Sequence, residues 1–337
     1  MKRIRKSAKL QQTHEYLKSG NAAIFNSQIQ MAIHEYYKAL EIAKEQGYRK
    51  EKTQAYLALG DAYISDKQNK TAIQCFKKSL KIARKQRYRM EESQAYLGLG
   101  DAYISDKHNQ SAIQYYEKSL AIARQQAYRK EETQAYLRLG HAYRLISNQI
   151  AIQHYEKALE IAAEEEYKLQ ETQAHQWLGS AYRSEQQSKA AIQHYETSLK
   201  IAREQGYNLE ETQAYLGLGK AHLSDSQNQP AIQHYKKVLE IATEQEYKQE
   251  EIQAYLGLGD AYISVNQNQM AIKYYEKGLE TAREQGRKLD ETQAYFGLGE
   301  AYISDNQNQT AIQHFEQALK IAKEQGCKLD ETRAYLG

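Results

Sequence analysis

The stretch Ala55-Tyr56-Leu57-Ala58-Leu59-Gly60-Asp61-Ala62-Tyr63 decides the fold, because it recurs along almost the whole chain. Another copy reads Ala254-Tyr255-Leu256-Gly257-Leu258-Gly259-Asp260-Ala261-Tyr262. The glycine that anchors each copy returns every forty residues, except for one interval of thirty-nine between Gly140 and Gly179. A fixed period of this length predicts a solenoid, in which each unit buries its apolar face by stacking on its neighbours.

Each repeat is predicted to form two helices. In the copy from Thr53 to Glu92, numbered here as positions 1 to 40, the apolar residues of the first half gather on one face at 100° per residue, as in an amphipathic helix. The second half repeats the pattern around Ala72 and Phe76, and a short polar segment, 66–69, separates the two halves. The chain has only one proline, at an expected first helical turn. The sequence therefore predicts antiparallel helix pairs throughout.

Glycines inside the first helix need a packing reason, because a glycine there costs about 1 kcal/mol of helix propensity. At position 8, as at Gly100, we expect the missing Cβ to let the second helix approach closely. Leucine at that position should therefore be badly tolerated. At position 6, as at Gly98, the helical step predicts a side chain on the solvent face, where leucine should be nearly neutral.

Six residues of the repeat carry a resemblance to a known family: Tyr56, Leu59, Gly60, Tyr63, Ala72 and Phe76. They match the pattern aromatic-x2-Leu-Gly-x2-Tyr followed by Ala-x3-Phe of the tetratricopeptide repeat. The forty-residue variant resembles the arrays of Partner-of-Inscuteable type G-protein-signalling modulators and, more loosely, kinesin light chain. The resemblance implies an all-α fold, a right-handed superhelix of antiparallel helix pairs, with a concave groove that binds peptides.

The repeat divides the chain into eight units and two flanking pieces. A basic segment, 1–12, precedes the first unit, and 332–337 begins a ninth repeat that is cut short. The predicted units are residues 13–52, 53–92, 93–132, 133–171, 172–211, 212–251, 252–291 and 292–331, of which the fourth is one residue short. This deletion, before Ala151, should alter the turn between the two helices of that unit.

Composition and charge exclude several classes of function. With 46 Lys and Arg against 43 Asp and Glu, no global field attracts nucleic acid. No apolar run approaches the roughly twenty residues that a membrane span needs, and the N-terminus lacks the apolar stretch of a signal peptide. Two distant cysteines, Cys75 and Cys327, form no disulfide framework. We therefore expect a cytoplasmic protein without membrane insertion.

Neither a metal site nor a catalytic motif is predicted. His154, His194, His234 and His314 recur once per repeat, which places each on a separate layer rather than in a cluster. No phosphate loop, nucleophile elbow or zinc spacing occurs. The expectation is a protein that is not an enzyme and needs no cofactor.

Function is expected on the first-helix face that points away from the core. Position 9 is acidic near both ends of the array, at Asp61, Asp101, Asp260 and Glu300. The middle repeats instead place basic residues at positions 6, 9 and 12, namely Arg138, His141, Arg144, Arg183 and Lys220. The single tryptophan, Trp177, lies at position 6 of the same region. Arginine forks match carboxylates and phosphates, so these ten residues are the candidate peptide-binding site.

Two interpretations of these residues stay open at this stage. The charges can be solvated side chains paired with neighbouring glutamates, or they can hold an acidic or phosphorylated segment. Trp177 can be a binding hot spot, or it can fill the space beside His175, which replaces a core tyrosine and is predicted to be a satisfied core histidine.

The predicted function is a scaffold that holds an extended, acidic peptide of a protein partner in its groove. The alternative is a sensor or targeting arm of a larger enzyme or signalling protein whose effector domain lies outside this chain. End-to-end self-association through the uncapped C-terminal repeat is a further predicted contact.

Overall fold

The chain was described by a computed structural model that covers residues 2–26, 28–144 and 146–325. Within these ranges it forms sixteen α-helices and no strand, so the predicted all-α solenoid class is confirmed. Cys327 and the predicted start of a ninth repeat, 332–337, lie outside the described residues.

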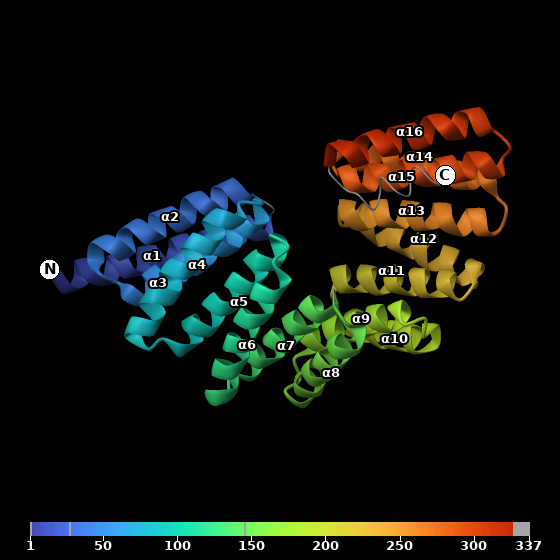
Figure 1. The fold of residues 1–337 in the computed structure, drawn as a ribbon. Coiled ribbons are helices and arrows are strands. Elements are labelled where there is room, and N and C mark those ends of the chain that lie inside the picture. Colours follow the sequence, from blue (N-terminus) through green and yellow to red (C-terminus); the bar gives the residue numbers. More distant parts are fainter. Residues whose placement is uncertain (1, 27, 145, 326–337) are drawn as a thin grey trace. The chain divides into compact units, whose positions relative to one another are not determined.

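The helices alternate between the first and second member of each predicted hairpin (Figure 1). The first helices are α1 (Lys2–Phe25), α3 (Arg49–Ser65), α5 (Arg89–Ser105), α7 (Arg129–Arg144), α9 (Lys168–Ser184), α11 (Asn208–Ser224), α13 (Lys248–Ser264) and α15 (Lys288–Ser304). The second helices are α2 (Ile29–Gln46), α4 (Asn69–Gln86), α6 (Asn109–Gln125), α8 (Asn148–Glu164), α10 (Ser188–Gln205), α12 (Asn228–Glu244), α14 (Asn268–Glu284) and α16 (Asn308–Gln325).

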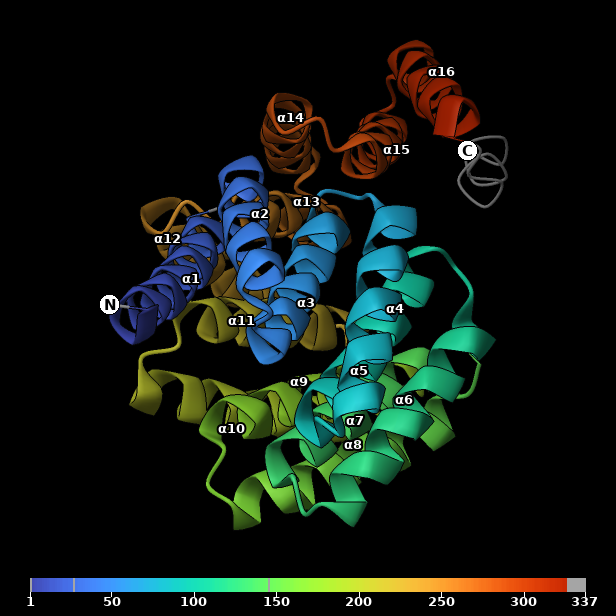
Figure 2. The ribbon, with the colours of Figure 1, turned by 90° about the vertical axis from the view of Figure 1, so that its left-hand side faces the viewer.

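The chain forms two compact units, residues 1–170 and 171–337. Inside each unit a first helix contacts its own second helix, the preceding second helix and the first helices of adjacent repeats, as α5 contacts α6, α4, α3 and α7. In the second unit, Figure 2 shows α14, α15 and α16 almost end-on, with their axes running side by side. Contacts between neighbours in sequence thus build each unit.

An aromatic ring held between two glycines is the main packing device. A Cβ on Gly60 would lie 2.5 Å from Cε1 of Phe76 in the same repeat, which confirms the expected close approach at position 8. A Cβ on Gly98 would lie only 2.2 Å from the same atom, although Gly98 belongs to the next repeat. The expectation that position 6 faces solvent is therefore wrong. Gly98 is buried because the second helix of the preceding repeat packs against it.

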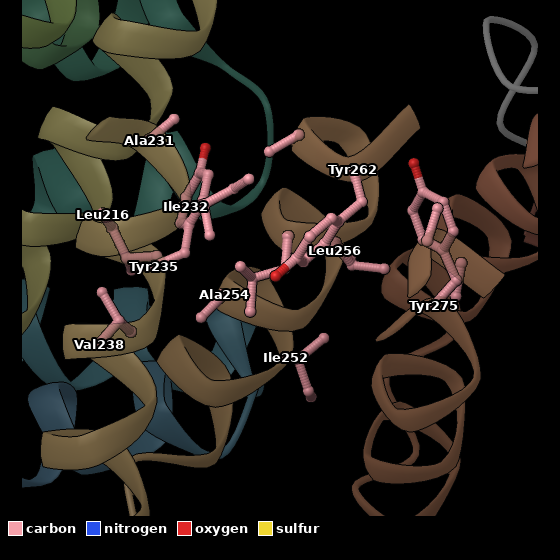
Figure 3. Packing of buried hydrophobic residues seen from close by; sticks show 14 of the residues in the cluster. Leu216, Ala231, Ile232, Tyr235, Val238, Ile252, Ala254, Leu256, Tyr262 and Tyr275 are labelled. Atoms are coloured by element: carbon pink, nitrogen blue, oxygen red, sulfur yellow. The ribbon is translucent and has the colours of Figure 1, made fainter. Parts of the chain in front are cut away.

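The second unit repeats the device with tyrosine. Tyr235 on α12 lies within 2.6 Å of a Cβ built on Gly219 of α11 and within 2.4 Å of one built on Gly257 of α13. Its ring is almost completely buried and lies among Leu216, Ile232 and other apolar side chains (Figure 3). Each aromatic ring of this kind therefore ties two successive repeats together.

The ends of the helices follow the sequence in part. Gly47 and Gly206 end α2 and α10 in the left-handed conformation that is typical of a glycine stop. Arg87 takes the same conformation after α4 without being glycine. Helix α3 has 17 residues and begins at Arg49, before position 1 of the repeat.

The helix that follows the one-residue deletion begins differently from its counterparts. The residue before α8 is Ser147, whose Oγ accepts a hydrogen bond from the Ile150 amide. At the matching place before α4, α10 and α12 stands a glutamine whose side chain makes no capping bond. In the fourth repeat, a serine cap thus stands where these repeats have a glutamine.

Candidate peptide-binding face

The candidate residues divide between the two units. Asp61, Asp101, Arg138, His141 and Arg144 lie in the first unit, on α3, α5 and α7. Trp177, Arg183, Lys220, Asp260 and Glu300 lie in the second unit, on α9, α11, α13 and α15. Along the chain, the first unit changes from acidic to basic and the second from basic to acidic.

In the first unit, Arg138 is bound by Asp101. Its Nε donates to both carboxylate oxygens, at 2.9 and 3.0 Å, and the Tyr116 hydroxyl donates to Oδ1 of Asp101 at 2.7 Å. Burial opposes the charge of Arg138, but Asp101 outweighs it and the pKa of Arg138 is raised. Arg138 therefore occupies the glycine position beside an aromatic ring and balances an acid of the preceding repeat.

Asp61 lies next to this ion pair. Desolvation and the negative charge of Asp101 raise the pKa of Asp61 to about 7, while Arg138 opposes the shift. The side chain is still reached by solvent, so water weakens these interactions. Asp61 thus differs from Asp101: its own repeat carries Phe76 at the place of Tyr116, and phenylalanine has no hydroxyl to donate.

His141 and Arg144 complete the basic end of this unit. Both side chains are half-buried on α7. Burial, together with the charge of Arg144, lowers the pKa of His141, although Asp101 acts in the opposite direction. Around neutral pH His141 is therefore an uncharged hydrogen-bonding group rather than a cation.

In the second unit, three predicted residues line one cavity of about 260 Å³: Trp177, Arg183 and Lys220. Amide side chains complete the lining, among them Gln213 and Gln253, and Nζ of Lys220 donates to Oε1 of Gln253 at 2.8 Å. This cavity joins an aromatic ring, two cations, one acid, Glu250, and neutral hydrogen-bonding groups in a single site.

The two cations of this cavity are only partly compensated. Burial and the charge of Arg183 lower the pKa of Lys220, against the opposing effect of Asp260 and Asp290. Nε of Arg183 is buried and forms no hydrogen bond with any described residue. A buried donor without an acceptor is costly, so the cavity favours an incoming anion.

Asp260 and Glu300 line a neighbouring cavity of about 250 Å³, with Phe296 and Gln293. The Tyr275 hydroxyl donates to Oδ1 of Asp260 at 2.5 Å, which repeats the arrangement of Tyr116 and Asp101. The second unit therefore places a cationic cavity and an acidic cavity on successive first helices.

Sequence reasoning missed the amides, although a signal was present. Glutamine occupies position 2 in seven of the eight repeats, at Gln54, Gln94, Gln134, Gln173, Gln213, Gln253 and Gln293. Core packing does not explain why a polar residue recurs at a position outside the apolar face. Its recurrence could therefore have indicated that the exposed face of the first helices is used for binding. His175, by contrast, behaves as predicted: its Nδ1 lies 2.9 Å from Nδ1 of His194, and it is a satisfied, half-buried group.

Across residues 2–26, 28–144 and 146–325, no three His, Cys, Asp or Glu side chains gather as metal ligands would. None of the helices described is long and apolar enough to cross a bilayer.

Comparison with known families gives one match. The family model described as "Tetratricopeptide repeat" matches residues 53–125, 170–244 and 250–324. A search among curated proteins finds no match.

Several solved structures have the same fold. The apo form of the quorum sensor NprR from B. thuringiensis has a TM-score of 0.72 at 16% identity, over 92% of this chain and 87% of that one. A signal transduction ATPase with a tetratricopeptide repeat sensor, from Pyrococcus horikoshii, has a TM-score of 0.67 at 16% identity, over 93% and 48%. The Rap conjugation gene regulator of the plasmid pLS20, in complex with a peptide, has 0.58 at 18% identity, over 92% and 75%. At these identities the likeness concerns the fold.

Proposed function

Because the chain belongs to the tetratricopeptide repeat family, we propose that it is a non-enzymatic scaffold that binds an extended, acidic peptide segment on its first-helix face. The cavity of Trp177, Arg183 and Lys220 is the observation that carries this proposal. The peptide complex of the Rap conjugation gene regulator, which has the same fold, supports peptide binding as the general mode. The finer resemblance to Partner-of-Inscuteable arrays stays a prediction.

The cavity suits a carboxylate side chain. The guanidinium of Arg183 can donate through its unpartnered Nε, and Lys220 adds a second positive charge on the next first helix. Trp177 offers an apolar surface for the neighbouring peptide residue, and the glutamines can bond to its backbone. An acidic residue followed by an apolar one is the dipeptide that this arrangement favours.

Arg138 is a weaker candidate than the sequence suggested. Asp101 already accepts from its Nε, so an incoming carboxylate would have to compete with an internal one. In the first unit we therefore assign Asp61 to the selection of basic or amide side chains, whereas Asp101 is occupied by Arg138 and Tyr116, and we assign acid capture to the second unit.

Trp177 makes the proposal directly testable, because it is the only tryptophan in the chain. Titration with a ten-residue peptide containing alternating glutamate and leucine should change its fluorescence, whereas the lysine-leucine counterpart should not. The change should weaken with salt, because exposed charges are screened over about 8–10 Å at physiological ionic strength.

The double variant Arg183→Gln and Lys220→Gln should lower the affinity at least tenfold while keeping helicity and melting temperature close to wild type. Lys200→Gln, a removal of one exposed charge on α10, is the matched control and should bind normally. If the double variant binds the glutamate peptide as the wild type does, the cationic cavity is not the site.

The similar ATPase favours a second candidate function. There a tetratricopeptide repeat sensor is part of a longer protein, of which this chain covers 48%. The same peptide-binding face would then act as the sensor of an effector domain on the same polypeptide. The complete reading frame of the gene distinguishes the two: an effector domain in frame supports the sensor, and its absence supports the separate scaffold.

A further inference from the structure

A second cationic cavity lies in the first unit, away from the peptide-binding face. Helices α3 and α4 enclose about 420 Å³, lined by Arg49, Lys52, Tyr56, Lys78, Lys81, Ile82, Lys85 and Gln86. It has no lining residue in common with the cavity around Asp61 on the first-helix face. Five cations and no acidic residue line this cavity.

Most other repeat boundaries carry a glutamate there. It is the residue just before position 1: Glu92, Glu132, Glu171, Glu211, Glu251 and Glu291. Glu92 is only 4% exposed and lies 3.3 Å from Nε of Arg84 and 2.8 Å from Nη1 of Arg89. Glu132 is held in the same way by Arg124 and Arg129. At the boundary before the second repeat, the residue in this place is Lys52.

A second charge reversal lines the same cavity. Lys85 is at position 33, where six other repeats carry glutamate: Glu45, Glu164, Glu204, Glu244, Glu284 and Glu324. Helix α4 contains six lysines and arginines and no acidic residue, whereas each of the other second helices contains at least one glutamate. Two positions that are usually acidic have thus become basic on the two walls of one cavity.

Arg49 lacks the carboxylate partner that its counterpart Arg89 has in the next repeat. Arg49, the counterpart of Arg89, donates through Nη1 to Oε1 of Gln86 at 2.9 Å instead of to a glutamate. Lys52, Lys81 and Lys85 form no ion pair with any residue that the structure describes. Like charges around a recess repel one another and concentrate anions from solution. The place of the internal glutamate is therefore open to an external anion.

We propose that this cavity binds a phosphorylated segment of a protein partner. Two arginines suffice for the single charge of Glu92, whereas five cations match the charge of about −1.5 to −2 and the three acceptor oxygens of a phosphate monoester. The recess also holds Tyr56 and Ile82, which suit the hydrocarbon of a flanking side chain. A recess that holds one group favours a phosphopeptide over a membrane surface or a nucleic-acid strand, since these need an extended basic stripe.

The probe is a fluorescein-labelled ten-residue peptide with one phosphoserine among alanines and glycines, and its binding is followed by fluorescence anisotropy. It should bind at least tenfold more tightly than its unphosphorylated twin. Vesicles with phosphatidylserine and a single-stranded oligonucleotide are the competing ligands. Equal binding of the two peptides, or binding of only the vesicles or the oligonucleotide, overturns the proposal.

Lys52→Glu is the most informative variant, because it restores the residue that most other boundaries carry. Phosphopeptide affinity should fall at least tenfold, while the melting temperature should stay equal or rise as Arg49 regains a carboxylate partner. Lys85→Glu should act in the same direction. Lys200→Glu, on the exposed side of α10, is the control and should leave affinity unchanged. A Lys52→Glu protein that is folded and binds like the wild type contradicts the assignment.

Discussion

Phe76 and Tyr116 occupy the same place in successive repeats, yet their surroundings differ. Phe76 lies between Gly60 of its own repeat and Gly98 of the next. Tyr116 also faces a glycine of its own repeat, Gly100, but Arg138 stands where the second glycine would be. One boundary uses position 6 for close packing, and the other uses it for a charge.

The hydroxyl group explains why the two boundaries have different chemistry. Tyr116 donates to Asp101, and Arg138 binds the same carboxylate, so the acid keeps two partners. Phe76 has nothing to donate to Asp61, whose pKa is raised. The two acids thus differ in their partners: Asp101 accepts from a core tyrosine and from Arg138, whereas the core ring of the repeat that carries Asp61 has no hydroxyl group.

The largest effect is expected for Gly98→Leu. A Cβ there would lie 2.2 Å from the Phe76 ring, and the ring cannot retreat because Gly60 lies on its other side. We expect a loss of about 1–3 kcal/mol or more in the free energy of unfolding, beyond any gain in helix propensity. Chemical denaturation followed by circular dichroism measures it.

The matched control is Ala58→Gly, at position 6 of the preceding repeat, which removes a Cβ instead of adding one. It should cost no more than about 1 kcal/mol through helix propensity. Equal stability of the Gly98→Leu protein and the wild type would falsify the ring-and-glycine packing.

A smaller effect is expected from exchanging the two aromatic residues. Tyr116→Phe removes a hydrogen bond to a carboxylate whose side chain is about one third exposed, and should cost about 1 kcal/mol. Phe76→Tyr should provide Asp61 with the missing donor and lower its pKa. Chemical denaturation measures the stability of Tyr116→Phe, and carboxyl NMR titration measures the pKa of Asp61 in Phe76→Tyr. An unchanged pKa of Asp61 in Phe76→Tyr would contradict the role that we assign to the hydroxyl group.

The smallest effect concerns the pH dependence of Asp61. Its pKa is raised to about 7 in the folded protein, from the ordinary aspartate value of 3.8. The folded state therefore holds this proton more tightly, and the resulting stability is complete below about pH 4 and is lost as the pH rises through about 7.

Asp61→Asn should remove this dependence. The variant should be more stable than the wild type at pH 8, by less than about 1 kcal/mol because the side chain is reached by solvent, and no more stable at pH 4. Melting curves across this range check the sign, and a larger gain at pH 4 than at pH 8 would reverse our assignment.

The repeat was sufficient to predict the helices, their pairing and the packing role of position 8. It was not sufficient for position 6, because helical periodicity describes one helix and Gly98 is buried by the helix of another repeat. The predicted repeat boundaries also differ from the helix starts. Helix α3 begins at Arg49, but residues 49–52 precede the motif and were assigned to the previous repeat.

For the candidate site, sequence predicted which residues depart from the repeat but not which of them meet. Trp177, Arg183 and Lys220 line one cavity, which depends on how far successive first helices are offset. Whether Arg138 has an internal partner depended on the reach of its side chain to Asp101. Departures from a repeat therefore indicate where to look, and side-chain geometry determines what each residue contacts.

Because Phe76, Tyr195, Tyr235 and Tyr275 each lie between glycines of two repeats, the physical building block is not the stretch that the sequence motif delimits. A fragment that ends with a second helix leaves its last ring covered on one face only, whereas a fragment that continues through the next first helix covers both faces. Shortened versions of this protein for crystallography or display should accordingly be cut after a first helix, as after α5 (Arg89–Ser105), which supplies Gly98 to the Phe76 ring.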